Sequence, residues 1–524
     1  MAGERRRRLG ALGLATLAVL AACSSGGGAD SERSDDAPTT QAPADGGTDG
    51  PTPTDGGAAA PGALRLGFAG VTSLDPASAS PASVSAMALA DLLHDGLTVL
   101  DAVGAPQPAL ADFVPGEDLT TWRFTLREGV TFADGSPVEA DDVVFTIERI
   151  RAQGGSSLAA IQLEDVQGVA AVDPRTVELT LRAPSALLPE VLSSPLYGIV
   201  DRYLPPAGPD APLNPSGPYR VATAPQRLAL ERRAGAGPAA VEARLFPDDA
   251  AAHDAFAAGE LDWAPVPLDH LGTLDEASLA WAPFHATVLL GVNPSVEPLT
   301  RPALRHAVGL AIDRAAVTAA VFGSTARPAH GLIPAGVAGA SESCRGPCGA
   351  DVERARQLVA EAFPEGTPPP PLRLLTDETS THEAIATLVV QQLGEIGLDV
   401  TAQALDEGTY AAQVAAGQAP LYLHSALGTS RMPATHLLPW ASDSPDNTTR
   451  YANPLVDLAI AAAVSEPDRA VRIARWQEIE AAVLADVPVV PLAQLRTIVA
   501  VTGRAKGMVV HADGSIDLSA VAPA

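Results

Sequence analysis

The feature that most constrains the fold of this sequence is a strand–helix–strand unit that begins near residue 371. The apolar segment "PLRLLT" precedes the helical pattern "THEAIATLVVQQLGEIG", and a second strand-like segment, "LDVTAQAL", follows it. A helix that links two such strands requires a parallel pair with a right-handed crossover. Strand and helix patterns alternate along the whole chain after residue 63, which predicts an α/β protein with mixed sheets.

The stretch from residue 121 to residue 150 combines both periodicities. Residues 121–126 alternate apolar and polar side chains, which is typical of a half-buried strand. Turn residues follow, and residues 130–132 predict the start of a second strand. Residues 138–150 then carry apolar side chains at helical spacing, with acidic residues in the first turn. The stretch therefore reads as scaffold, because it holds no recognisable catalytic set.

Length and charge limit the classes of function. A chain of 524 residues is long enough to form two or more domains, and 47% hydrophobic with 18% charged residues indicates a globular protein. The formal net charge is −28. Binding to nucleic acid requires Lys and Arg side chains that displace counterions from phosphates, so we expect no nucleic-acid partner.

The N-terminus has the pattern of a secretory signal peptide. Arg5–Arg8 form a basic region, and the apolar run from residue 9 to residue 20 is shorter than the roughly 20 residues that span a bilayer. The following "LAAC" resembles the lipobox of bacterial lipoproteins, which implies cleavage after residue 22 and a diacylglycerol on Cys23. The alternative is an ordinary secreted protein with a stray cysteine, and the export route stays open.

Residues 23–62 consist almost entirely of small and polar residues and cannot bury enough apolar surface to fold. We interpret them as a flexible tether, so that the protein is extracytoplasmic and lipid-anchored to the cell membrane. The remaining cysteines, Cys344 and Cys348, flank a Gly-Pro pair. Outside the cytoplasm this spacing predicts a small disulfide loop, with a metal site as the alternative.

Several segments in order carry a family resemblance. "TWRFTLREGVTFADGSPVEADDVVFTIERI", "NPSGPYRV", "AAGELDW" and "TRPALRHAVGLAIDRAAVTAAVFGSTARPAHGLIP" resemble the family 5 extracellular solute-binding proteins, the peptide/nickel-type receptors of ABC importers. The resemblance covers essentially all of residues 63–524. It implies a two-lobed, periplasmic-binding-protein-like clamshell: lobe I from 63 to 289, lobe II from 290 to 490, and a return to lobe I from 491 to 524. The two hinge crossovers would lie near "LLGVN" and "VVPLAQ".

The resemblance also implies the function. A receptor of this kind binds a small-molecule or peptide ligand between its lobes and delivers it to permease and ATPase subunits. We expect a monomer without a cofactor or a resident metal. A lipoprotein that senses a ligand without transport, and a metal-chelate receptor, are the alternatives. The sequence has no G-x-S-x-G, H-E-x-x-H or Walker A motif, so we do not expect an enzyme.

The segment "SALGTSRMPATHLLPW", residues 425–440, is the main candidate for ligand contacts. Peptide-binding members of the family carry a Trp and an Asp here, and the Asp pairs with the ammonium group of the peptide. In this sequence Leu427 stands where the Trp would be, Ser430 stands where the Asp would be, and Arg431 follows. A guanidinium suits a ligand with a carboxylate or phosphate, whereas a solvated loop residue is the alternative.

Other candidates follow predicted strands, because residues at the ends of strands line a cleft between lobes. His436, together with His424, could serve a metal chelate, and Trp440 could stack on a ligand ring; structural roles are the alternative for each. The remaining candidates are loop residues after the first strand, a crossover residue and an acidic residue after the strand "LRLLT": Val71, Thr72, Ser73, Asn293 and Asp377.

Overall fold

The computed structural model describes residues 62–522 apart from 206–212, 224–226, 268–269, 272, 342–348, 365–366 and 429. The predicted signal peptide and nearly all of the tether lie outside the described residues. So do Cys23 and the predicted disulfide of Cys344 and Cys348. In the described part of the chain, no helix combines the length and the apolar character that a membrane crossing needs.

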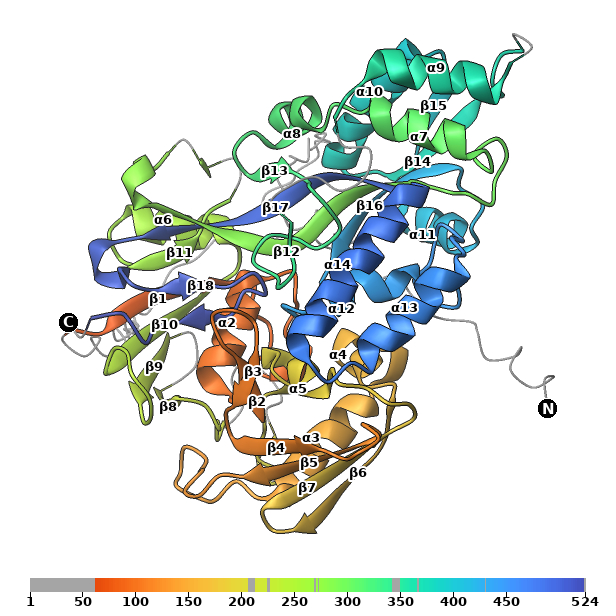
Figure 1. The fold of residues 1–524 in the computed structure, drawn as a ribbon. Helices are drawn as coiled ribbons and strands as arrows, with labels where there is room; N and C mark the ends of the chain where they lie inside the picture. Colours follow the sequence, from red (N-terminus) through yellow and green to blue (C-terminus); the bar gives the residue numbers. More distant parts are fainter. Residues whose placement is uncertain are drawn as a thin grey trace, which may run out of the picture.

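One large mixed sheet runs through the molecule and joins both lobes (Figure 1). Ten strands follow one another in the order β15-β14-β16-β12-β17-β11-β1-β10-β9-β8, and β13 pairs with β17 beside this path. In that order the strands are β15 (Val400–Leu405), β14 (Leu372–Asp377), β16 (Leu421–Leu427), β12 (Leu279–Val292), β17 (Val489–Val501), β11 (Trp263–Pro265), β1 (Leu64–Ala69), β10 (Ala240–Phe246), β9 (Arg227–Arg232), β8 (Tyr219–Thr223) and β13 (Ala326–Pro328).

The two long central strands, β12 and β17, carry the chain across the middle of this sheet. They pair with each other in antiparallel fashion along most of their length. Toward lobe II β12 also pairs with β16, and toward lobe I β17 also pairs with β11. The two predicted crossovers, "LLGVN" and "VVPLAQ", therefore fall within paired strands. Their register shifts between Pro283 and Thr287, which marks an irregularity near the middle of the molecule.

The predicted strand–helix–strand unit is confirmed. β14 and β15 are parallel neighbours, and α10 (Ser380–Glu395) connects them. Thr379 caps α10 by accepting a hydrogen bond from the backbone N–H of His382. Apolar side chains of α10 pack on this end of the sheet together with those of α7 (Pro302–Ala311) and α9 (Val352–Ala362).

A separate sheet of four antiparallel strands forms the far end of lobe I, shown at the bottom of Figure 1. The alternation of residues 121–126 is confirmed, because the apolar residues of that strand are buried. The prediction of a second strand at 130–132 is wrong: only an isolated bridge between Thr131 and Pro137 forms, since turns at Gly129 and Gly135 leave too little chain between them. The strands are β4 (Ala111–Pro115), β5 (Thr121–Leu126), β7 (Thr176–Leu181) and β6 (Val166–Asp173).

Two short ribbons and the remaining helices complete the described structure. The ribbons are β2 (Thr98–Leu100) with β3 (Pro106–Pro108), and β18 (Val509–Val510) with β19 (Ile516–Asp517). The remaining helices are α2 (Val84–Leu93), α3 (Ala140–Arg151), α4 (Leu158–Gln162), α5 (Leu188–Val191), α6 (Asp249–Ala257), α8 (Arg314–Phe322), α11 (Glu407–Ala415), α12 (Ala434–Leu437), α13 (Pro454–Val464) and α14 (Arg469–Asp486).

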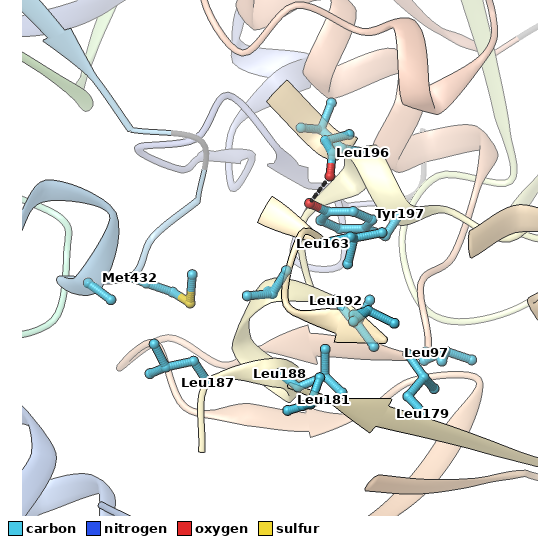
Figure 2. Packing of buried hydrophobic residues seen from close by; sticks show 14 of the residues in the cluster. Leu97, Leu163, Leu179, Leu181, Leu187, Leu188, Leu192, Leu196, Tyr197 and Met432 are labelled. Atoms are coloured by element: carbon cyan, nitrogen blue, oxygen red, sulfur yellow. Dashed lines mark hydrogen bonds between the residues drawn. The ribbon is translucent and has the colours of Figure 1, made fainter. Parts of the chain in front are cut away.

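The largest apolar cluster contains residues of both lobes. Residues of the four-stranded sheet and of α3 pack there with residues of α13 and α14. Figure 2 shows Met432, which follows β16, and Leu187, which precedes α5, as members of the same apolar cluster. Both side chains are nearly inaccessible to solvent. The seam between the lobes is therefore a packed interface in this structure.

Candidate interlobe binding site

Charged side chains of α14 fasten the two lobes together. Arg472 donates through Nη2 to Oε1 of Glu190 in α5 at 2.6 Å, and both side chains are only 6% exposed. Arg469 donates to the backbone carbonyl of Val103 at 2.7 Å. A backbone hydrogen bond from Ala186 to the carbonyl of Val464, at the end of α13, also crosses the seam at 2.8 Å. Burial strengthens these electrostatic contacts between the lobes.

Arg431 also bridges the lobes, and its charge is paired with a carboxylate of the protein. Its Nε lies 3.4 Å from Oδ2 of Asp513, and its Nη2 donates to the carbonyl of Leu100 at 3.3 Å. Its Nη1 lies 3.3 Å from Nδ1 of His511. Burial alone would raise the pKa of Asp513, but Arg431 and the Ser515 hydroxyl outweigh it and hold that pKa below its ordinary value.

Ser430 and His436 lie in a compact polar cluster beside Gly428. A Cβ on Gly428 would stand 2.7 Å from the His436 ring, so the ring packs directly on this glycine. Burial, and then the neighbouring His285 of β12, lower the pKa of His436 to about 3; burial also lowers the pKa of His285. Both imidazoles are therefore neutral at pH 7. Among the described residues, Ser430 Oγ and His436 Nε2 have no hydrogen-bond partner.

Asp377 belongs to a buried relay. Its carboxylate accepts from Thr379 and lies 2.9 Å from Nδ1 of His382, whose Nε2 lies 3.1 Å from Oγ of Ser425. The order of atoms is that of a serine hydrolase triad. However, Ser425 lies within β16 opposite Val288, whereas a nucleophile of that kind needs an exposed turn. The relay locks the first turn of α10 onto β16.

Three other predicted candidates have structural roles. Asn293 is fully buried and its side chain ties the end of β12 to Gly417 and Ser295. Leu427 packs against the apolar group formed by Phe284 and Ala286. Trp440 is 8% exposed and donates to the His436 carbonyl, so its ring is part of the core.

The loop after β1 holds the last three candidates. Thr72 is exposed, and Val71 and Ser73 are partly buried. The Ser73 hydroxyl accepts from the backbone N–H of Asp75 at 3.1 Å, which shapes the turn. The structure thus brings Ser430, Arg431 and His436 together in the seam. It places Asp377 and Asn293 in hydrogen-bonded positions of lobe II.

Sequence reasoning missed His285, His511 and Asp513. His285 gave the only available signal, because a histidine inside the apolar strand "FHATVLLGVN" needs a buried partner. Its Nε2 lies 3.2 Å from the carbonyl of Pro81. Elsewhere in the described residues, His253, Asp254 and His270 bring possible metal-ligand atoms within 4.8 Å of one another, away from the predicted candidates.

Two lobes joined by two long crossing strands, with a polar cluster in the seam, define a clamshell-type solute-binding protein. The sequence model for "Bacterial extracellular solute-binding proteins, family 5 Middle" matches residues 105–448. The chain belongs to this family. The resemblance inferred from the sequence segments is confirmed.

Similar proteins of known description agree with this assignment. The chain is 25% identical over 457 residues to the glutathione-binding protein GsiB of Salmonella typhi, covering 80% of this chain and 86% of the relative. It is 24% identical over 473 residues to the dipeptide-binding protein DppE of Bacillus subtilis (strain 168), covering 81% of this chain and 86% of the relative.

Solved structures share the fold. The periplasmic murein tripeptide binding protein MppA, in its unliganded open form, gives a TM-score of 0.76 at 22% identity, covering 88% of this chain and 96% of that one. NikA from Brucella suis, in complex with Fe(III)-EDTA, gives 0.71 at 19% identity, covering 88% and 100%. The predicted α/β clamshell is thereby confirmed.

Proposed function

We propose that this protein captures a peptide-like solute between lobe I (63–289 and 491–524) and lobe II (290–490) and delivers it to an ABC importer. One observation carries the ligand class: the buried, neutral polar cluster of Ser430, His436 and His285. A buried polar group without a partner costs about 1–3 kcal/mol, so a ligand that supplies hydrogen bonds here is favoured.

The electrostatics of the seam favour an uncharged group at this position. Peptide amides offer donors and acceptors without charge, which suits a serine hydroxyl and a neutral imidazole. An anion would have to compete with Asp513 for Arg431. The names of the relatives GsiB and DppE, which bind glutathione and dipeptides, support the same ligand class.

Titration calorimetry on the full chain with glutathione and a set of di- and tripeptides tests this proposal. We expect Ser430→Ala and His436→Ala each to weaken binding about tenfold, the loss expected for one buried hydrogen bond. Ser442→Ala, an exposed serine after Trp440, is the matched control and keeps wild-type affinity. Wild-type affinity in both cluster variants, or binding of non-peptide solutes only, would contradict the proposal.

The proposed role is binding and not catalysis. The Asp377–His382–Ser425 relay is buried in lobe II, and a hydroxyl held inside β16 cannot reach a scissile bond in the seam. Incubation of the full chain with a bound peptide should return the peptide intact by mass spectrometry. Hydrolysis that disappears in Ser425→Ala would refute this part of the proposal.

The proposed location is the outer face of the cell membrane, through a lipid on Cys23. The basic and apolar segments before "LAAC" support it. We expect Cys23→Ser to move the protein from the membrane fraction into the soluble fraction. A variant that stays with the membrane would show that another element anchors it.

A further inference from the structure

A hollow opens beside the hinge, next to the polar cluster in the seam: the Phe284 ring in its wall lies 5.1 Å from the His285 ring, centroid to centroid. It has a volume of about 120 Å³ and lies where β12, β13 and β17 meet. Its walls include Trp281 and Phe284 from β12, Arg327 from β13, and Gln494 and Arg496 from β17. The register shift between β12 and β17 falls at this position, and it interrupts the regular pairing that would otherwise fill the space.

Arg496 is held in place but keeps donors to spare. Its guanidinium lies over the Trp281 ring, 4.3 Å from the centroid, and Nη1 donates to the carbonyl of Ser324 at 3.2 Å. A guanidinium has five N–H donors in a fixed fork. Among the described residues, Ser324 is the one hydrogen-bond acceptor for this side chain. The guanidinium is therefore fixed in orientation but still has free N–H donors.

The hollow is a positive site in an acidic protein. In the described part of the chain, neither Arg496 nor Arg327 forms an ion pair with a carboxylate, although the formal net charge is −28. Burial, and then the charge of Arg327, lower the pKa of Arg496. By contrast, Arg431 pairs with Asp513 and Arg472 pairs with Glu190. Two neighbouring cations without an acid favour an anion from solution.

The neighbouring side chains define the shape of the occupant. Gln494 already donates to the carbonyl of Ile333 and accepts from the backbone of Ala335, so it forms a wall and leaves recognition to the arginines. Trp281 and Phe284 offer flat apolar surfaces. The volume is close to that of the roughly 150 Å³ cavity known to hold benzene.

We propose that this hollow is a second ligand site, which binds a small molecule with one carboxylate or phosphate group and a flat apolar body. The Arg327 and Arg496 side chains clamp the anionic group, and Trp281 and Phe284 contact the apolar body. None of the residues predicted for the seam lines the hollow, so different variants test this site and the proposed capture of a peptide-like solute.

The test is titration calorimetry on the full chain with sodium benzoate and with inorganic phosphate, and with benzamide as the uncharged analogue of benzoate. We expect saturable binding of benzoate and at least tenfold weaker binding in Arg496→Gln and in Arg327→Gln. Arg354→Gln removes the same charge from an exposed position on α9, where Arg354 pairs with Glu361, and should bind as wild type.

The outcomes are distinct. Binding of benzoate alone shows that the apolar body is required, and binding of phosphate as well shows that charge suffices; either supports the site. Absence of saturable binding, benzamide binding as tight as benzoate, or wild-type binding in Arg327→Gln would overturn the proposal. Arg327 is exposed, so its replacement gives a folded variant even if Arg496→Gln is unstable.

Discussion

Replacement of Glu190 by Gln should loosen the contact between the lobes. The change leaves the guanidinium of Arg472 buried beside an uncharged group, with Arg469 also nearby at 3.9 Å from Glu190. Removal of one partner of a buried ion pair costs about 3–5 kcal/mol. Because Arg472 keeps the carbonyl of Glu466 as an acceptor, we take the lower value of about 3 kcal/mol.

If the ion pair exists only between closed lobes, this cost falls on the closed state alone. About 3 kcal/mol then raises the open fraction about 100-fold, since every 1.4 kcal/mol is a factor of about ten. The backbone N–H of Ala186 reports the opening directly, because its acceptor, the Val464 carbonyl, lies in the other lobe. Hydrogen exchange followed by mass spectrometry on the peptide that contains Ala186 measures the exchange rate of this N–H, which rises with the open fraction.

Glu178→Gln is the matched control. Glu178 pairs with Arg123 at 3.0 Å inside the four-stranded sheet, and both side chains are substantially exposed. An exposed pair contributes less than about 1 kcal/mol, so exchange at Ala186 should change less than about fivefold. Equal exchange rates in Glu190→Gln and the wild type would show that the pair does not hold the lobes together.

Three further changes test buried charges and close packing. Arg431→Ala leaves Asp513 buried without its cation and should lower the free energy of unfolding by about 3 kcal/mol at pH 7. Because the folded pKa of Asp513 is depressed, this loss of stability should shrink as the pH falls below about 4. A loss that does not depend on pH in urea titrations would refute the pairing of Arg431 with Asp513. Burial, and then the charges of Asp513 and Asp95, raise the pKa of Asp91 to about 8. Protonated Asp91 therefore stabilises the fold fully below about pH 4, and this stability is lost as the pH rises through 8, by up to about 1.4 kcal/mol per pH unit. Asp91→Asn should flatten the dependence of the unfolding free energy on pH over this range, and an unchanged dependence would contradict the raised pKa of Asp91. Gly428→Ala forces a methyl group against His436 and should lower the free energy of unfolding in urea by about 1–3 kcal/mol. Gly394→Ala, in open space on α10, is the control and should not destabilise the protein. Equal stability of the two variants would show that the polar cluster around His436 is loosely packed.

The fold was largely predictable because its signals are local. Alternation in residues 121–126 and helical spacing in α10 are properties of neighbouring residues, and burial in the structure follows them. Asp313 also caps α8 as its position before the helix indicates. The failed strand at 130–132 had the right side chains but lay between two turns.

The site was less predictable because its electrostatics depend on partners from distant parts of the chain. Arg431 had the chemistry of an anion clamp in the sequence, but Asp513 and His511 reach it from the C-terminal segment. Glu190 and Arg472 are 282 residues apart. No local pattern reveals which charge a folded chain will neutralise, and this is why the unpaired arginines at the hinge were also not foreseen.

The most direct test of solute capture is mass spectrometry of the small molecules that co-purify with the full chain. We expect one peptide-like solute per protein molecule, present in the wild type and in Ser442→Ala and depleted in Ser430→Ala and His436→Ala. A co-purified solute without peptide bonds, or equal retention in all four proteins, would contradict it.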